Sequence, residues 1–273
     1  MKNLLIFFIS ISLCYCKSSD EGEREKKTEL QNGGYALLPY VINQEGDTLI
    51  QGIGKYYSNE GKLTDEIEFK NSKKSGWHKT YNSEGIYSKI FYVDGLATGE
   101  GFFYGKSGKI DAESFYERDK MCATKYFNSS GKIRLINFYD DTKVFYAVKF
   151  DSAGKISNEK GVVFAYNFIY NQQPDSVRVG TLFEAKIPVV ILEGHITNIE
   201  AVRFNPKYEI FEVIDSLPIR NYFAVFQTFF DEPGQQTIGI VGELRANDGR
   251  LVRKDTLYKI INVITNKGAE IDR

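Results

Sequence analysis

Few residues of the sequence have the side chains and spacing that catalysis or metal binding requires. His78 and His195 are its two histidines, and neither has a second metal ligand at the short spacing of a zinc site. Cys122 has no histidine near it in the sequence, so we expect a small buried thiol rather than a nucleophile. These residues predict no metal, no cofactor and no catalytic group, and we do not expect an enzyme.

Two further patterns resemble catalytic motifs. The segment from Gly101 to Ser107 has three residues between its two glycines, whereas a phosphate-binding loop needs four and lies between a strand and a helix. The acidic pairs Asp65-Glu66 and Asp140-Asp141 are the residue types of a glycosidase. These pairs fall on predicted turns and strand edges, where we expect charged side chains to serve solubility.

The N-terminus has the features of a targeting sequence. An apolar run of ten residues ends at Leu13, which is too short to span a bilayer and suits a secretory signal. Cys16 follows three residues later, in a pattern that resembles a bacterial lipoprotein signal, although Tyr15 stands where a small residue is usual. The resemblance implies lipidation of Cys16, a signal peptide over residues 1–16 and an outer-membrane lipoprotein that faces the periplasm or the cell surface. The alternative is an ordinary cleaved signal.

Residues 17–34 are expected to form a flexible, charged tether. Lys17 to Asn32 holds five acidic and four basic residues and almost no apolar side chains, so it cannot bury a core. The whole chain has 35 basic and 36 acidic residues, a net charge of -1, and this balance predicts no nucleic-acid partner. The expected partners are a membrane, through the lipid, and a protein or a glycan.

The middle of the chain repeats. Glycines at positions 61, 85, 108, 131 and 154 are spaced 24, 23, 23 and 23 residues apart, each within a short polar segment. An aromatic residue precedes each polar segment and a large apolar residue follows it; the five pairs are Tyr57/Leu63, Tyr81/Tyr87, Tyr104/Ile110, Phe127/Ile133 and Phe150/Ile156. A glycine turn flanked by an aromatic and an apolar residue predicts an antiparallel β-hairpin. Because a lone hairpin is only marginally stable in water, the hairpins are expected to stack edge to edge in one sheet.

These hairpins resemble a known family. The segments Gly52–Tyr57 and Gly76–Tyr81 each place a tyrosine five residues after a glycine, ahead of a glycine-containing turn. This pattern is similar to the MORN repeat, and closest to its bacterial antitoxin-type variant, over about residues 50–158. The resemblance implies a single-layer, MORN-like sheet over residues 35–159 that is used for binding or scaffolding.

Two sets of residues on the repeats are candidates for binding. The aromatic candidates are Tyr57, Trp77, Tyr81 and Tyr104, which could stack against sugars or peptides if exposed, or form the core if buried. The basic candidates are Lys62, Lys109, Lys132 and Lys155, which follow the turn glycines and would form a row along one edge of the sheet. This row could meet phosphates or acidic side chains, or could simply protect the tips of the hairpins.

Residues 160–273 differ in composition from the repeats. Five prolines appear after Gln173, and the segments around Pro233 and Asn247-Asp248-Gly249 predict hairpin turns between strands. Six to eight strands over about one hundred residues predict an immunoglobulin-like β-sandwich. The chain is therefore expected to be all-β.

Three functions are compatible with these features. The first is a cell-envelope lipoprotein whose repeats act as a non-catalytic binding or scaffold module. The second is a secreted polysaccharide-processing enzyme, or its accessory subunit, with a cleft between the two domains. The third, which rests on the relatives of the repeat, is an antitoxin-like or immunity protein.

Overall fold

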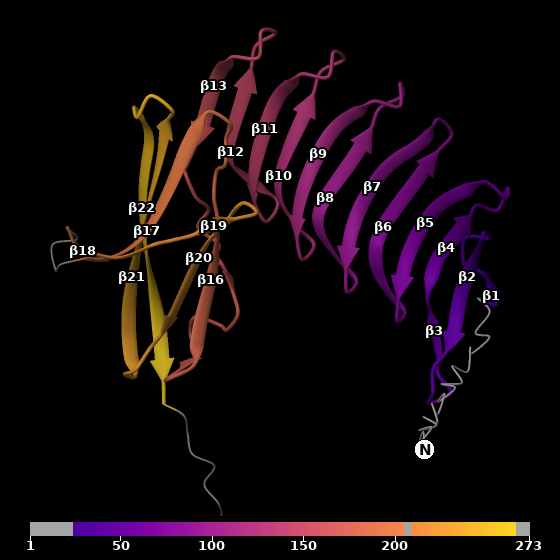
Figure 1. Ribbon diagram of the computed structural model, residues 1–273, viewed down its shortest axis with the longest axis horizontal. Coiled ribbons are helices and arrows are strands. Elements are labelled where there is room, and N and C mark those ends of the chain that lie inside the picture. Colours follow the sequence, from indigo (N-terminus) through magenta and orange to yellow (C-terminus); the bar gives the residue numbers. More distant parts are fainter. Residues whose placement is uncertain (1–23, 205–208, 266–273) are drawn as a thin grey trace, which may run out of the picture.

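The computed structural model describes residues 24–204 and 209–265, and Cys16 with the rest of the signal peptide lies outside them. The described residues contain β-strands and turns without a helix, and they form one long sheet followed by a C-terminal domain of two smaller sheets (Figure 1). The all-β prediction and the antiparallel hairpin sheet are confirmed.

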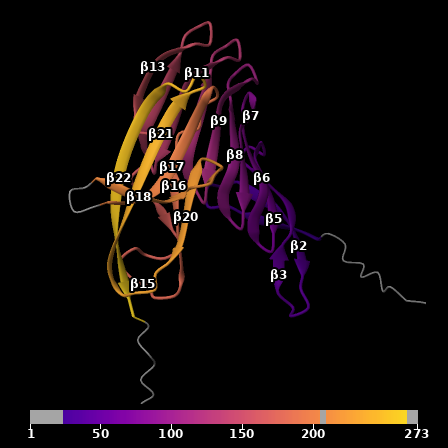
Figure 2. The same ribbon diagram turned by 60° about the vertical axis from the view of Figure 1, so that its left-hand side comes forward.

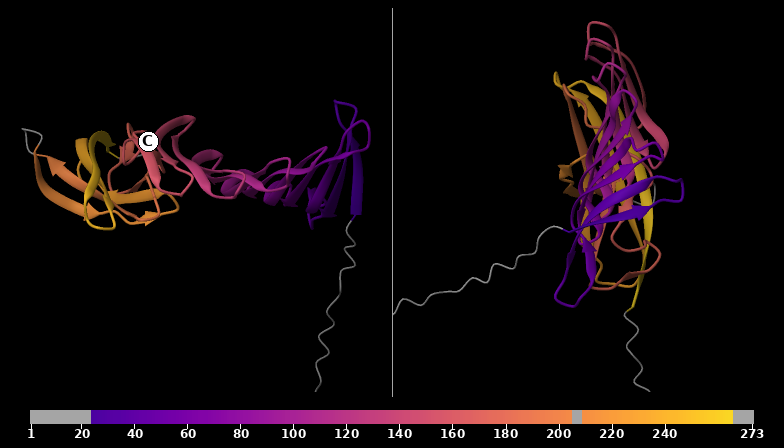
Figure 3. Two further views of the ribbon diagram at one scale, coloured as in Figure 1. Left: turned by 90° about the horizontal axis from the view of Figure 1, so that it is seen from above. Right: turned by 90° about the vertical axis from the view of Figure 1, so that its right-hand side faces the viewer.

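The long sheet has 13 strands, and β3 pairs with β2 beside the main path. Its strands are β1 (Arg24–Glu29), β2 (Tyr35–Ile42), β3 (Thr48–Ile50), β4 (Gly52–Tyr57), β5 (Leu63–Lys70), β6 (Lys73–Asn82), β7 (Gly85–Val93), β8 (Leu96–Tyr104), β9 (Ile110–Glu117), β10 (Lys120–Phe127), β11 (Ile133–Asp140), β12 (Lys143–Phe150) and β13 (Ile156–Gly161). From β4 to β13 each strand pairs with its neighbours in the chain, as stacked hairpins require. The long sheet is a single layer, with the C-terminal domain at the end where β13 lies (Figures 2 and 3).

The N-terminal edge differs from the prediction. Strand β1 pairs with β2 over Arg24–Glu29, so this part of the expected flexible tether is an ordered strand. Backbone pairing does not require apolar side chains, and the charged sequence of β1 suits an exposed edge, because charges oppose pairing with another sheet.

The polar segments form the hairpin tips. Their first residue accepts backbone hydrogen bonds: Asn128 Oδ1 from the amides of Ser130 and Lys132, at 3.0 Å each. Gly131 has φ of +80°, a conformation that side chains disfavour. Each tip thus has a glycine near its end, and four of the five begin with an acceptor side chain. The fifth tip begins at Gly105, where only the backbone carbonyl accepts.

The predicted pairs across these tips are present with one exception. Tyr57 pairs with Leu63 and Tyr104 with Ile110. Tyr81, however, pairs with Ile86 rather than with Tyr87. The tip between β6 and β7 is shorter, because Asn82 already pairs with Gly85, and this shifts the register by one residue.

Paired residues share a side of the sheet, so the register defines its two faces. One face, here called the tyrosine face, carries the paired row Gly54, Ile67, His78, Ile90, Gly101, Ser114, Thr124, Asn137 and Ala147. The opposite face, here called the docking face, carries the paired row Lys55, Glu66, Lys79, Lys89, Phe102, Glu113, Lys125, Ile136 and Val148.

The tyrosine face builds a core within one layer. A Cβ atom on Gly101 would stand 2.8 Å from the ring of Tyr116, which is 8% exposed, so the missing side chain makes room for the ring. The hydroxyls of Ser114 and Thr124, both buried, satisfy each other at 2.8 Å. Aromatic rings packed over small residues thus form a buried layer on this face of the sheet.

The C-terminal domain has two sheets. The four-stranded sheet has the order β14-β16-β20-β19 and the five-stranded sheet the order β15-β22-β21-β17-β18. The strands are β14 (Ile169–Tyr170), β15 (Val177–Arg178), β16 (Leu182–Pro188), β17 (His195–Phe204), β18 (Ile210–Ser216), β19 (Ile219–Arg220), β20 (Phe223–Phe229), β21 (Gly234–Ala246) and β22 (Leu251–Ile264).

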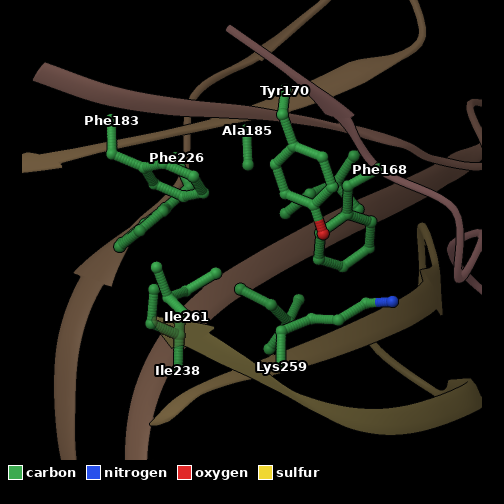
Figure 4. A pocket seen from close by; sticks show the side chains of 10 residues that line it. Phe168, Tyr170, Phe183, Ala185, Phe226, Ile238, Lys259 and Ile261 are labelled. Carbon is green, nitrogen blue, oxygen red and sulfur yellow. The ribbon is translucent and has the colours of Figure 1, made fainter. Parts of the chain in front are cut away.

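The two smaller sheets share an apolar core. Phe183 and Phe226 from one sheet face Ile238 and Ile261 from the other (Figure 4). The space left among them is about 10 Å³, which is no larger than one water position. This interior is packed rather than shaped for a ligand.

The C-terminal domain packs on the docking face where that face becomes apolar. Phe138 on β11 is 0% exposed and belongs to one core with Val148, Val163 and Phe164. From β4 to β10 the central row of the docking face is mostly charged, whereas Ile136 and Val148 continue it on β11 and β12. The change in side-chain type along the row therefore fixes the place where the domain packs.

Candidate functional site

The charged part of the docking face is the candidate binding surface. It extends from β4 to β10, and we call it the open face; its central row is Lys55, Glu66, Lys79, Lys89, Phe102, Glu113 and Lys125. Each of these residues pairs with the next across neighbouring strands, so regular backbone hydrogen bonding holds the row in place. The side chains are thus presented on a rigid support.

The central row of the open face contains two ion pairs, Glu66 with Lys79 and Glu113 with Lys125. Lys79 Nζ lies 3.0 Å from Glu66 Oε2, and the Tyr81 hydroxyl donates to the same oxygen at 2.8 Å. The hydrogen bond from Lys79 is the main cause that lowers the pKa of Glu66, and burial opposes it. Burial and then the bond to Glu66 raise the pKa of Tyr81 to about 12. At neutral pH the carboxylate is therefore ionised and the phenol protonated.

Trp77 is the centre of an aromatic cluster beside this row. Its ring meets Phe91, its cross-strand partner, edge to face at 5.1 Å, and Phe102 at 6.1 Å. Lys89 Nζ lies 3.8 Å from the centre of the Trp77 ring, in a cation–π contact. All three rings are half-buried, so part of each ring packs against its neighbours and part remains accessible to solvent.

The predicted tyrosines lie at the tip side of the docking face. Tyr57 stacks on Tyr35 with ring centres 4.8 Å apart, and Tyr81 bonds to Glu66 as described. Tyr57, Tyr81 and Tyr104 are all half-buried. The structure thus places them on the same side of the sheet as Trp77, and Tyr81 is part of the open face.

The four predicted lysines lie at the tips along one edge of the sheet, and all are exposed. Lys62 pairs with Glu60 at 2.7 Å within its own tip. Lys109 and Lys132 each donate to a carbonyl of the next tip, on Ser129 at 3.5 Å and on Ser152 at 3.3 Å. The latter two side chains link neighbouring hairpins, and none of the four lies within the open face.

Where the open face meets the C-terminal domain, the structure contains a cavity of about 280 Å³. It is lined by Glu100, Glu113, Phe115, Ala123, Lys125 and Tyr222. Lys125 Nζ lies 3.3 Å from Glu113 Oε1, and the ring of Tyr222 lies 5.2 Å from that of Phe115. Burial raises the pKa of Tyr222, so its hydroxyl stays protonated at neutral pH.

Sequence reasoning missed this cavity. Alternation along the strands could have placed Glu113, Phe115 and Lys125 on one face. No local signal brings Tyr222 to them, because it comes from the turn between β19 and β20 in the other domain. The cavity is therefore a product of domain packing.

Cys122 and His78, the reactive side chains noted in the sequence, do not line this cavity. Cys122 is 4% exposed, and burial raises the pKa of its thiol to about 12. His78 is on the tyrosine face, with Nε2 2.8 Å from Asp65 Oδ1. Among residues 24–204 and 209–265, no three His, Cys, Asp or Glu side chains gather as a metal site would require. No membrane-spanning helix occurs in this part of the chain.

The chain was compared with known proteins. No family model matches it, and no curated protein does. Among solved structures, a mutant of S. aureus TarM in complex with fondaparinux, alpha-GlcNAc-glycerol and UDP matches 34% of this chain with 15% identity and a TM-score of 0.28. A second TarM structure matches 44% of the chain with 14% identity and a TM-score of 0.20. This chain spans 19% of either neighbour's length.

Proposed function

We propose that this chain is a cell-envelope lipoprotein, anchored in the outer membrane through Cys16, whose hairpin repeats form a non-catalytic module that binds a protein or a glycan. The observation that carries the binding role is the open face: aromatic and charged side chains in one register across seven strands, β4 to β10. Its ion pairs and rings are already ordered, so binding would cost little side-chain entropy.

We also propose that the long sheet is MORN-like and that the C-terminal domain is immunoglobulin-like. The sheet order supports the second assignment. Lettered along the chain from β14 to β22 as A, A′, B, C, C′, D, E, F and G, the four-stranded sheet reads A-B-E-D and the five-stranded sheet A′-G-F-C-C′. An immunoglobulin sandwich has A-B-E-D facing C-F-G, with C′ added beside C in the variable type.

Photo-crosslinking in the native host tests the binding role. A photoreactive phenylalanine analogue at Phe91, in the aromatic cluster, should crosslink to a partner. The same analogue at Ile196, which is 51% exposed on β17 of the C-terminal domain, is the matched control and should not. Equal products at both positions, or none at Phe91, would contradict the proposal.

The anchor is tested separately. Mass spectrometry of the mature N-terminus should find a lipidated Cys16, and Cys16→Ala should release the protein from membranes. A variant that stays in the membrane fraction would refute lipid anchoring through this cysteine, and would leave the open face as a binding surface unaffected.

A further inference from the structure

We propose that the cavity at the domain junction is a subsite for one sugar ring of a neutral glycan, and that the glycan chain continues over Phe102 and Trp77. This inference rests on the proposed binding role of the open face and names its ligand. At about 280 Å³, the cavity lies just below the roughly 300 Å³ at which sites for drug-sized molecules begin. It therefore suits a single ring better than a large ligand.

The lining matches the two kinds of surface that a sugar ring presents. Phe115 and Ala123 supply an apolar floor for the C–H face of the ring. Glu100 and Glu113 accept hydrogen bonds from hydroxyls, and Lys125 donates them.

The charge of the lining selects the class of glycan. Two carboxylates and one ammonium leave the cavity with one net negative charge, from Glu100, Glu113 and Lys125. A uronate, sulfate or phosphate group would meet this charge unfavourably, whereas a neutral sugar would not. The cavity therefore favours neutral glycans over acidic ones.

The open face offers a path for the rest of the chain. Phe102 pairs with Glu113 on the neighbouring strand, and Trp77 lies on β6, three strands from β9. Neighbouring strands are about 4.8 Å apart, so this path is about 14 Å long, the scale of a short oligosaccharide. Aromatic rings along it can stack against successive sugars.

The same surface is poorly suited to a protein partner. The centres of protein interfaces are depleted in lysine and glutamate. On the open face, Lys79, Glu66 and Glu113 lie in the central row, between the rings rather than around them. Polar groups placed among aromatic rings are the arrangement that hydroxylated ligands need.

The test uses the full chain in detergent and its single tryptophan, Trp77, as a reporter. Cellotetraose, chitotetraose and maltotetraose are the neutral probes, and a hyaluronan tetrasaccharide is the acidic one. We expect at least one neutral probe to change Trp77 emission saturably, with the same affinity by calorimetry, and the acidic probe to bind more weakly.

Glu113→Gln keeps the size of the side chain and should weaken this binding at least about tenfold through the loss of a charged hydrogen-bond acceptor. Glu60→Gln removes the same charge from an exposed ion pair at a distant tip, with Lys62, and should bind like the wild type. Thermal unfolding of both variants checks that they are folded. Glu100→Gln is the second cavity variant, because Glu100 takes part in neither of these ion pairs.

Three results would overturn the inference: no response to any neutral probe, tighter binding of the acidic probe, or unchanged affinity in Glu113→Gln and Glu100→Gln. The outcome remains separable from that of the proposed function. A protein crosslinked specifically at Phe91, with no response to the neutral probes, would refute the glycan subsite and retain the binding role.

Discussion

The ring of Tyr222, in the turn between β19 and β20, lies 5.2 Å from the ring of Phe115 on β9 and 6.1 Å from that of Phe138 on β11. One side chain of the C-terminal domain thus contacts two strands of the long sheet. Asn221 and Tyr222 both have positive φ, so a tight turn directs the ring toward the sheet. The salt bridge between Lys186 and Glu117, at 2.7 Å, lies in the same junction.

Removal of the Tyr222 ring should loosen the junction. We expect Tyr222→Ala to lower the free energy of unfolding by about 2 kcal/mol, less than for a fully buried aromatic because the residue is half-buried. Tyr222→Phe keeps the ring and should stay within about 0.5 kcal/mol of the wild type. Urea unfolding measures both, and a loss below about 0.5 kcal/mol in Tyr222→Ala would contradict the role of the ring.

The bond from Tyr81 to Glu66 should stabilise the protein until the phenol ionises. The pKa of Tyr81 rises from 10.0 to about 12 in the folded state, so its contribution is complete below pH 10 and is lost as the pH rises toward 12. Tyr81→Phe should cost about 1 kcal/mol at pH 7 and less at pH 11.5. Tyr104→Phe is the control, and an equal pH dependence in both variants would argue against the bond.

The ion pair between Lys79 and Glu66 should weaken in acid. The folded-state pKa of Glu66 lies below 4.5, so its stabilisation is present above that pH and is lost as the pH falls through the folded value. The difference in unfolding free energy between the wild type and Lys79→Met should therefore shrink below pH 4.5. Lys62→Met, at an exposed pair, should show little difference at any pH.

The thiol of Cys122 should be unreactive in the folded protein. Its pKa is raised to about 12 and it is 4% exposed, so almost none is thiolate and reagents cannot reach it. Ellman's reagent at pH 8 should leave Cys122 unmodified until guanidinium unfolds the chain, with the modified residue located by mass spectrometry. Modification within minutes in native buffer would rule out this burial.

Substitutions at the hairpin tips separate turn formation from the lysine row. Asn128→Ala should cost about 1 kcal/mol, because two backbone amides lose their acceptor. Lys109→Met should cost less than about 0.5 kcal/mol, since its 3.5 Å bond to Ser129 is long and exposed. A larger loss in Lys109→Met than in Asn128→Ala, by thermal unfolding, would give the lysines the greater structural role.

The repeat architecture could be predicted because it is local. A glycine every 23 or 24 residues and the aromatic residues around it determine tips, strands and pairing without distant contacts. The pairing of Tyr81 with Ile86 was not predicted, because the tip between β6 and β7 is shorter than the repeat pattern suggests. Strand β1 was not predicted either, because its pairing depends on backbone hydrogen bonds, which a charged sequence such as Arg24–Glu29 does not reveal.

The candidate site could be predicted only in part. Trp77 and Tyr81 were expected from their residue types, and both lie on the open face. Lys79, Lys89 and Glu113 appear in the sequence as ordinary strand charges, and only the register across strands aligns them. Tyr222 reaches the site through tertiary packing, which has no signature in a single sequence.

The ladder from β1 to β13 also has a mechanical consequence. Beyond β4, each strand pairs within the sheet with its neighbours in the chain, and β1 forms the N-terminal edge through its pairing with β2. Tension applied at Arg24 would load the hydrogen bonds of one strand pair at a time and peel strands in succession. The repeats would then act as an extensible spring, with the junction around Tyr222 and Phe138 as its last point of resistance.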